Sequence, residues 1–364
     1  MNKLSLKAKP INMQQLMELA KSEGASDLHI TNNMPPVLRI KGALTQYNCA
    51  PYNAREIQDL FYDSLTPKQI NVFETKMSVD LAITAKGVGR FRVAGYMQRG
   101  AIAIALRLLA DGIPSFGSLG LPPSLAKLPR FREGLVLVTG VTGSGKSTTL
   151  ATIIDEINNR YHYHIFTVED PIEYVHDNNK SMVNQRELYT DVPSFSEALR
   201  DSLRADPDVI LVGEMRDPET IRMAIMAAET GHLVLSTLHS RDCISTVNRI
   251  IGNFPASEQM QVRQQLSSSI RAVVSQKLLP NIDGSKRVPA VEIMFANSGI
   301  ANLIRQGKDE MIYSSIETGM RDGMQTMEQS LAQLVNEGKI SLDSALSAAK
   351  NPAMLKKRLC KAYG

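Results

Sequence analysis

The sequence predicts an α/β protein with two domains, and three observations support this fold class. In residues 1–110, short strands with alternating apolar residues are mixed with helical segments, which indicates a small α+β domain. In residues 131–364, apolar strands alternate with amphipathic helices, which indicates a mostly parallel sheet covered on both faces. Between them, residues 111–130 are dense in proline and glycine and form a candidate hinge or linker.

Composition narrows the class of protein. The chain has 364 residues, 43% hydrophobic and 21% charged, which is typical of a soluble globular protein. The net charge of +4 is too small to indicate nucleic-acid binding. The three cysteines lie far apart, which fits a reducing cytoplasm and predicts neither a disulfide framework nor a zinc site. No stretch reaches the roughly 18 apolar residues of a membrane span, so we expect any membrane contact to be peripheral.

The first domain is expected to hold strands with helices on one side. A helix with apolar residues at Leu16, Met17 and Leu19 ends before Gly24, and Val79, Leu81 and Ile83 alternate as in a half-buried strand. The predicted elements, in chain order, are helix 13–20, strands 28–30 and 37–40, helices 54–62 and 67–74, and strands 79–83, 90–96 and 101–109.

The second domain is expected to continue the alternation of strands and helices. Ser194 and Glu197 form a capping box, and Pro218 occupies the first turn of another helix. The strands are predicted at 135–138, 165–168, 209–212 and 233–235. From residue 256 onward the chain is expected to be mostly helical, with a small hairpin around Asp283–Gly284 and helices at 299–306, 325–336 and 342–349.

Residues 140–147 form a complete G-x-x-x-x-G-K-[ST] phosphate loop, the Walker A motif, between an apolar strand and a helix. Glycines let the backbone N–H groups wrap an anion, Lys146 adds a point charge, and Ser147 offers a hydroxyl to Mg²⁺. A glycine-rich turn with a chance lysine is disfavoured by the flanking strand and helix. The predicted ligand is a nucleoside triphosphate with Mg²⁺, held by Gly140, Thr142, Gly143, Ser144, Gly145, Lys146, Ser147 and Thr148.

Two acidic segments follow predicted strands of the same sheet. Glu214 ends the strand 209–212 and is expected to lie beside the phosphates, where it can hold Mg²⁺ through water. The cluster 169–173 follows the strand 165–168, and one of its acids could polarise the attacking water. The alternative for this cluster is a solvated acidic turn, which Pro171 would also favour.

Histidines and arginines complete the set of candidates. His232 and His239 bracket the strand that starts at Leu233, and His239 falls at a strand end where a sensor of the γ-phosphate would be placed. A satisfied polar group is the alternative for each. Arginines such as Arg92 and Arg107 in the first domain could complete an ATP site from a neighbouring subunit, or they could be surface charges on strand faces.

Together these motifs resemble the type II/IV secretion ATPase superfamily. The segments that carry the resemblance are Gly140–Ser147, Glu169–Glu173, Gly213–Glu214, Gly231–His239, Gly24–His29 and Gly89–Val93, and the last two are similar to its PilT branch. Members of that branch are hexameric motors that retract type IV pili in twitching motility. The resemblance implies a PAS-like first domain, a RecA-like P-loop NTPase second domain and a cytoplasmic ring of six subunits that hydrolyses ATP.

The resemblance also assigns roles to residues of this sequence. It makes Glu173 the catalytic glutamate and places arginines at Arg92 and Arg107 across the ATP site from a neighbouring subunit. The remaining roles that it implies are Lys146 as the β/γ-phosphate ligand, Ser147 as the Mg²⁺ ligand, Glu214 as the Mg²⁺-associated acid, and His232 and His239 as sensing histidines. The implied partner is a platform protein at the cytoplasmic face of the inner membrane.

One departure from the family pattern leaves alternatives open. Retraction motors carry Ala-Ile-Arg-Asn-Leu-Ile-Arg-Glu, and here residues 299–306 lack the first arginine and the final glutamate. This leaves room for a PilU-like accessory paralogue that works beside another retraction ATPase. The chain has neither the four-cysteine zinc site nor the extra N-terminal domain of extension ATPases, so extension is disfavoured. A RecA-like nucleic-acid translocase is disfavoured by 5% aromatic content, no Trp and scattered charge, and a nucleotide-binding scaffold without hydrolysis is a further alternative.

Overall fold

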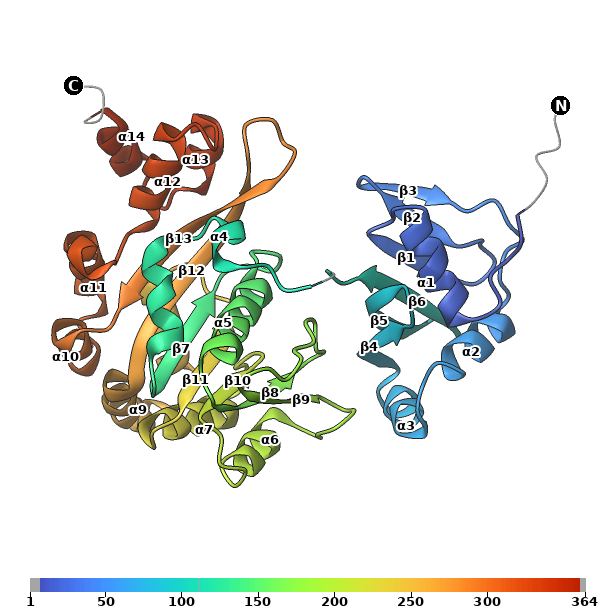
Figure 1. Cartoon of the computed structure of the whole chain (residues 1–364), viewed down its shortest axis with the longest axis horizontal. Coiled ribbons are helices and arrows are strands. Elements are labelled where there is room, and N and C mark those ends of the chain that lie inside the picture. Colours follow the sequence, from blue (N-terminus) through green and yellow to red (C-terminus); the bar gives the residue numbers. More distant parts are fainter. Residues whose placement is uncertain (1–6, 111, 361–364) are drawn as a thin grey trace. The chain divides into compact units, whose positions relative to one another are not determined.

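The computed structural model describes residues 7–110 and 112–360 and divides the chain into two compact units (Figure 1). Unit 1 holds the residues up to Gly112, together with two segments from later in the chain, Glu169–Val175 and Arg186–Ser194. Unit 2 holds the rest. The chain therefore leaves unit 2 and returns to it twice after the phosphate loop.

Unit 1 is built on a six-stranded sheet with the order β3-β2-β1-β6-β5-β4, and each neighbouring pair is antiparallel. Its strands are β1 (Asp27–Ile30), β2 (Val37–Ile40), β3 (Ala43–Gln46), β4 (Ser78–Ala85), β5 (Gly89–Gln98) and β6 (Ala101–Leu108). Its helices are α1 (Met13–Ser22), α2 (Ala54–Tyr62) and α3 (Pro67–Lys76). These elements confirm the mixed strands and helices expected from the sequence.

A single hydrophobic core joins the three helices of unit 1 to one face of its sheet. Phe61 of α2 and Phe73 of α3 meet edge to face, with ring centroids 5.1 Å apart, and Phe91 of β5 is fully buried in the same core. Because side chains alternate along a strand, Arg90 and Arg92 project from the opposite face of β5. The face without helices therefore carries the arginines.

Unit 2 is built on a seven-stranded sheet with the order β13-β12-β7-β11-β10-β8-β9. Strands β8, β10, β11, β7 and β12 run parallel, and β13 is antiparallel to β12. The strands are β7 (Gly134–Thr139), β8 (His164–Glu169), β9 (Met182–Glu187), β10 (Val209–Val212), β11 (Leu233–Leu238), β12 (Ile270–Pro280) and β13 (Arg287–Phe295). The mostly parallel sheet predicted from the sequence is confirmed.

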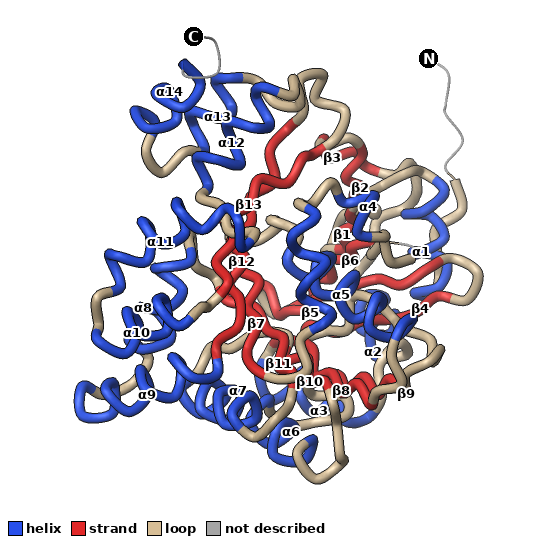
Figure 2. Tube along the Cα trace, turned by 60° about the vertical axis from the view of Figure 1, so that its left-hand side comes forward, coloured by secondary structure: helices blue, strands red, loops and turns tan. Residues whose placement is uncertain are grey.

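Helices cover both faces of this sheet. Helices α4 and α5 lie on one side of β7 and α7, α8 and α9 on the other (Figure 2). The helices of unit 2 are α4 (Phe116–Leu119), α5 (Lys146–Arg160), α6 (Phe195–Ser202), α7 (Pro218–Glu229), α8 (Cys243–Gly252), α9 (Ala256–Ser269), α10 (Ser298–Gln306), α11 (Ile312–Thr318), α12 (Met327–Asn336), α13 (Leu342–Ala348) and α14 (Pro352–Cys360). Short 3-10 helices η1 (Pro123–Arg130), η2 (Asp309–Met311) and η3 (Gly319–Asp322) join them.

The candidate hinge at 111–130 contains regular structure over much of its length. Helix α4 and η1 both fall within it, and Leu125 and Leu128 of η1 are fully buried in the main core of unit 2. Residue 111 lies outside the described residues. The segment that contacts neither core is therefore shorter than the proline and glycine content suggested, and hinge motion stays a prediction.

The expectation of mostly helical structure after residue 256 was wrong for β12 and β13. Instead of a small hairpin at Asp283–Gly284, these two long strands pair in continuous register from Ala272 with Phe295 to Pro280 with Arg287. Both strands are buried on both faces over most of their length, so they show no alternation that would separate them from a buried helix. Strand β9 and helix α8 were likewise not predicted.

Strand β13 separates two hydrophobic cores. Val291 and Ile293 belong to the main core of unit 2, whereas Val288 and Ala290 belong to a smaller core made with α12, α13 and α14. The C-terminal helices thus pack on the edge strand of the sheet through a core of their own. Among the described residues, the helices are too short or too polar for any of them to cross a membrane.

The core of unit 1 yields a packing prediction. A Cβ atom on Gly95 of β5 would lie 2.1 Å from the Phe61 ring, so Gly95→Ala should lower the free energy of unfolding by about 1–3 kcal/mol, the usual cost of overpacking. Chemical denaturation measures this change. Gly117→Ala is the control, because nothing lies within 4 Å of its added Cβ. Equal stability of the two variants would contradict the packing of Phe61 on β5.

Candidate functional site

The phosphate loop connects the carboxyl end of β7 to the start of α5. Its glycines Gly140, Gly143 and Gly145 have φ values of +146°, +76° and +89°, a backbone that side chains rarely adopt. The Lys146 ammonium donates hydrogen bonds to the carbonyls of Gly140 and Val141 at 3.0 and 3.2 Å. Side-chain caps are absent at the start of α5, so the helix N-terminus opens toward the loop.

Two observations show that the loop fits a phosphate. A Cβ atom on Gly140 would lie 2.4 Å from the Gln276 carbonyl oxygen, so the loop is packed too closely on β12 to accept a side chain there. The Ser144 hydroxyl is buried without a hydrogen-bond partner, which is costly unless a ligand supplies one. The Ser147 side chain, in contrast, belongs to an exposed residue. Both features fit the anion cradle that the sequence predicts at Gly140–Thr148.

Glu214 and His239 meet at the carboxyl ends of the strands, where the phosphate loop also lies. Glu214 follows β10, His239 follows β11, and their side chains approach to 3.3 Å. Strands β7, β11 and β10 are consecutive and parallel, so their carboxyl ends lie within about 10 Å of one another. Arg216 also pairs with Glu214, at 2.8 Å. The structure brings the predicted magnesium acid and one predicted sensing histidine together.

His232 lies at the amino end of β11, away from the phosphate loop. It precedes β11, whose six residues separate it from His239 by about 20 Å at the usual rise of a strand. Its Nδ1 atom contacts the Ala227 carbonyl at 3.0 Å, and its own carbonyl accepts a hydrogen bond from Gly134 at the start of β7. Within one subunit the structure does not bring His232 to the phosphate loop.

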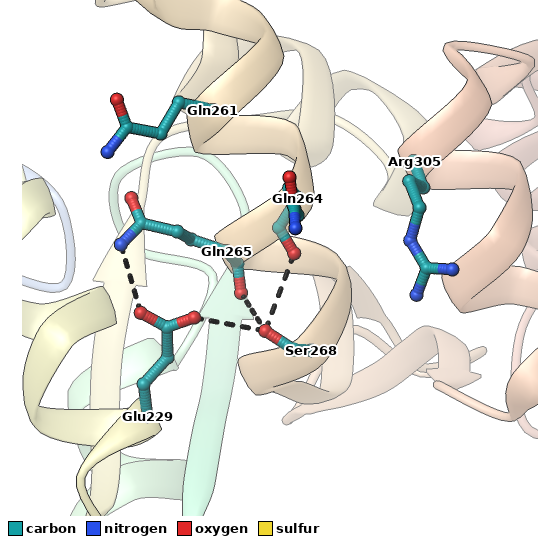
Figure 3. Close-up of a pocket in the computed structure, with 6 residues that line it drawn as sticks. All are labelled: Glu229, Gln261, Gln264, Gln265, Ser268 and Arg305. Carbon is teal, nitrogen blue, oxygen red and sulfur yellow. Dashed lines mark hydrogen bonds between the residues drawn. The ribbon is translucent and has the colours of Figure 1, made fainter.

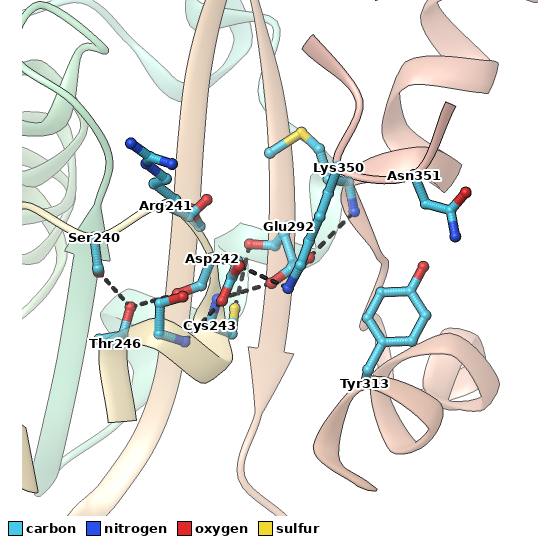
Figure 4. Close-up of polar contacts among 12 residues, drawn as sticks. Ser240, Arg241, Asp242, Cys243, Thr246, Glu292, Tyr313, Lys350 and Asn351 are labelled. Carbon is cyan, nitrogen blue, oxygen red and sulfur yellow. Dashed lines mark hydrogen bonds and ion pairs between the residues drawn. The ribbon is translucent and has the colours of Figure 1, made fainter. Parts of the chain in front are cut away.

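The loop after His239 is anchored on several sides (Figure 4). Asp242 caps α8 and pairs with Lys350 at 2.8 Å, which lowers its pKa although burial acts in the opposite direction. Glu292 of β13 is buried, and it accepts a hydrogen bond from the Cys243 backbone at 2.8 Å. Burial raises the pKa of both Glu292 and the Cys243 thiol. These contacts join the histidine loop to β13 and to the C-terminal helices.

Glu173 and Arg92 come together in unit 1. The nearest atoms of their side chains lie 3.9 Å apart, and both side chains are about one-third exposed, 33% for Glu173 and 37% for Arg92. Arg92 is held more closely by Asp80 of β4, whose two carboxylate oxygens accept from its Nε at 3.0 and 2.9 Å. The hydrogen bond to Asp80 raises the pKa of Arg92 further above its ordinary value. Asp80 therefore balances most of the charge that faces Glu173.

Arg92 and Arg107 stand directly opposite each other on β5 and β6. The same cross-strand row continues from Arg107 to Asp27 of β1 and then to Arg39 of β2. Adjacent like charges destabilise a sheet unless they are compensated. Asp27 compensates Arg107, which donates to it at 2.8 Å, and Asp80 compensates Arg92. The two predicted interface arginines thus share one exposed row of unit 1.

A cavity of about 750 Å³ adjoins the phosphate loop on the side of β12. It is lined by the loop residues 141–144, the end of β12, Arg287 and residues from both turns of α13. Arg287 donates to the Gly143 carbonyl at 3.3 Å. Since Glu214 and His239 lie on the β11 side of the loop, this cavity is on the other side of the cradle.

A second cavity, of about 550 Å³, lies between α7, α9 and α10 (Figure 3). Glu229 accepts hydrogen bonds there from Gln265 and Ser268, both at 3.0 Å, and Arg305 stands apart across the cavity. Glu229 ends α7 just before β11 begins. This cavity is therefore at the amino ends of the strands, whereas the phosphate loop is at their carboxyl ends. It is separate from the nucleotide cradle.

Sequence reasoning missed several residues that support the site. Gln276 of β12 is 3% exposed, and its side chain accepts from Thr149 of α5 at 2.9 Å, directly beneath the loop. Asp80 lies on β4 and is near Arg92 because β4 pairs with β5. The sequence alone does not reveal that pairing. Glu187 at the end of β9 is also buried, and an unpredicted strand gave no signal for it.

Comparison with known proteins agrees with this geometry. The sequence matches the family described as Type II/IV secretion system protein over residues 5–311. It is 44% identical to the type IV pilus retraction ATPase PilT of Pseudomonas aeruginosa, over 94% of this chain and 99% of that protein. It is 37% identical to the type IV pilus ATPase PilU of the same organism, over 93% of this chain and 89% of that protein.

A solved structure agrees as well. The crystal structure of the pilus retraction motor PilT with bound ADP superposes with a TM-score of 0.87 at 45% identity, over 96% of this chain and all of that one. Because the match extends over nearly the full length of both chains, the two-domain ATPase architecture is shared. The chain belongs to the type II/IV secretion ATPase family and, within it, to the branch of PilT-type pilus ATPases.

Proposed function

We propose that the chain is a hexameric motor that hydrolyses ATP to power the retraction of type IV pili, and that it thereby supports twitching motility. The observation that carries this proposal is the phosphate cradle of Gly140–Thr148, with its buried, unpartnered Ser144 hydroxyl, within a chain that is similar to PilT over nearly its full length. A scaffold that merely binds nucleotide would need no acid and histidine at the same sheet edge.

The cradle divides the work of binding among its residues. Lys146 now donates to two backbone carbonyls and would transfer those hydrogen bonds to the β- and γ-phosphates. The Ser147 hydroxyl would bind Mg²⁺ directly, and Glu214 would hold it through water. A magnesium ion at a nucleotide site takes most of its ligands from phosphate oxygens, a hydroxyl and water. Mg²⁺, when bound, neutralises charge on the phosphates.

We infer that Glu173 accepts a proton from the attacking water. A carboxylate acts in this way only while it is ionised and free of competing partners. Arg92 is 3.9 Å from Glu173 and bound mainly by Asp80, so only a weak contact occupies the acid. The row that holds Arg92 and Arg107 would then be offered to the ATP site of a neighbouring subunit, and His239 would report the γ-phosphate to Glu214.

The cavity beside β12 is the proposed place of the nucleoside. In this proposal the γ-phosphate faces Glu214 and His239, which contact each other on the β11 side of the loop. The remainder of the nucleotide therefore leaves on the opposite side, where the 750 Å³ cavity opens between residues 141–144 and α13. Asp343 and Ser347 in its lining offer polar groups to a ribose or a base.

The partners and location follow from the proposed activity. The motor would act as a homohexamer at the cytoplasmic face of the inner membrane, in peripheral contact with a platform protein at the pilus base. The segment 299–306 departs from the retraction motif, and this observation favours a second candidate function as a PilU-like accessory ATPase. In that case a paralogous retraction ATPase would be an additional partner.

The proposed catalytic glutamate can be tested by Glu173→Gln. The substitution keeps the shape of the side chain but removes its proton-accepting charge, so turnover should fall by at least about 10²-fold, the usual contribution of a general base. Binding of a fluorescent ADP analogue should be unchanged. Lys146→Ala is the reference variant that should lose binding itself. Wild-type turnover in Glu173→Gln would remove Glu173 from the mechanism.

The nucleoside cavity can be tested by filling it. Ala348→Trp should weaken ADP binding by about tenfold or more, equivalent to about 1.4 kcal/mol, whereas binding of inorganic tripolyphosphate should not change. Isothermal titration calorimetry with the two ligands separates these effects. Ser285→Trp, on the exposed turn of the β12–β13 hairpin and outside the cavity lining, is the control. Unchanged ADP binding in Ala348→Trp would place the nucleoside elsewhere. Equal loss of both ligands would show that the substitution disturbs the phosphate loop, and it would count against a separate nucleoside cavity.

The biological role can be tested by deleting the gene. Cells without a retraction motor should stop twitching and carry excess surface pili, because assembly continues without disassembly. Electron microscopy of pili and a motility assay measure both effects. Bald cells would indicate extension instead. Normal twitching that fails only under load, or only when a paralogous ATPase is also absent, would identify the accessory role.

A further inference from the structure

We infer that Arg90 and Glu187 are positioning residues for the catalytic glutamate, because together they clasp the backbone of Ile172, the residue before Glu173. This inference rests on the proposed role of Glu173 and goes beyond it. Glu187 lies outside the sequence motifs, and Arg90 lies within the segment Gly89–Val93 without a role assigned to it there. All the residues of the clasp belong to unit 1.

The clasp is a closed ring of three hydrogen bonds. Arg90 Nε donates to the Ile172 carbonyl at 2.8 Å, and the Ile172 N–H donates to Glu187 Oε2 at 3.2 Å. Arg90 Nη2 donates to the same Glu187 oxygen at 3.0 Å and closes the ring. Both polar groups of one peptide residue are therefore held, which restrains the position and the orientation of the chain that leads into Glu173.

Glu187 is built into unit 1 as a buried anchor. Its side chain is 7% exposed and also accepts from the Ala82 N–H at 3.4 Å and from the Thr190 hydroxyl at 3.3 Å. Ala82 lies on β4, the edge strand of the unit 1 sheet, whose outer N–H groups lack a strand partner. Burial raises the pKa of Glu187, while its donors and Arg90 act in the opposite direction. Glu187 thus joins the edge of the sheet to the Glu173 loop.

The spacing on β5 gives the two arginines different tasks. Arg90 and Arg92 are two residues apart and project from the same face of the strand. Arg90 holds the backbone at Ile172, and Arg92 faces the Glu173 carboxylate itself. The acid is consequently presented by the β4–β5 edge of unit 1, although the loop that carries it begins at the end of β8 in the unit 2 sheet. Loss of the clasp should misplace the acid without altering the phosphate cradle.

The test compares two clasp variants with a matched ion pair elsewhere. Arg90→Met and Glu187→Gln should each lower kcat at least tenfold, while the Kd for ADP and the KM for ATP stay within about twofold of wild type, since a shift in position costs rate rather than affinity. Arg263→Met is the control. Its partner Asp309 lies at 2.8 Å, with side-chain exposures of 21% and 8% against 20% and 7% for Arg90 and Glu187. The Arg263→Met variant should lose about as much thermal stability as the clasp variants but keep the wild-type kcat.

Two further variants keep the inference testable. Arg90→Lys retains the charge without the fork and should show an intermediate kcat, and it replaces Arg90→Met if that variant does not fold. The double variant Arg90→Met/Glu187→Gln should be no slower than the slower single variant, because both changes open the same ring.

Other results would overturn the inference. A kcat within twofold of Arg263→Met in both clasp variants, alongside an inactive Glu173→Gln, would show that the clasp does not position the acid. A loss of kcat matched by an equal loss of ADP affinity would assign the residues to general folding instead. If the wild-type chain itself does not hydrolyse ATP, the proposed function fails, and that result is distinct from either of these.

Discussion

The parallel pairing of β7 with β11 on one side and β12 on the other is the constraint on which the nucleotide site depends. Thr139, the last residue of β7, pairs with Leu238 of β11 and with Ser275 of β12. The phosphate loop begins at the next residue, so its position between the two neighbours is set by backbone hydrogen bonds. The β11 side then carries His239, with Glu214 beyond it in the loop after β10, and the β12 side carries Gln276 and the large cavity.

Glu173, the proposed catalytic acid, obeys a different constraint. The chain passes from unit 2 to unit 1 at Glu169 and back at His176, and does so again between Arg186 and Phe195. Both excursions belong to the same small region, since the Leu188 N–H donates to the Glu169 carbonyl at 2.9 Å. Glu173 and the residues that hold its loop therefore all belong to unit 1.

Much of this arrangement could be predicted from the sequence, because the relevant signals are local. The phosphate loop needs glycines at three positions of positive φ, and Pro218 and the capping residue Asp217 begin α7 as expected. Strands β12 and β13 could not be recognised, because burial on both faces removes the alternation that marks a strand. The clasp was equally hidden, since Arg90, Ile172 and Glu187 are separated by 82 and 15 positions and meet only through tertiary structure. His232 and His239 belong to one sequence motif, but they lie at opposite ends of β11. Membership of the motif therefore does not place both histidines beside the phosphate loop.

The double role of β13 has a mechanical consequence. Its Val288 and Ala290 pack with the C-terminal helices, and its neighbours Val291 and Ile293 pack in the main core. A load applied to α12–α14 would enter the sheet at β13 and cross β12 by shear on the nine paired positions between them before it reached β7. When two paired strands are pulled along their length, all the hydrogen bonds between them bear the load together rather than one after another. The C-terminal helices are therefore mechanically coupled, through β13 and β12, to the strand that ends in the phosphate loop.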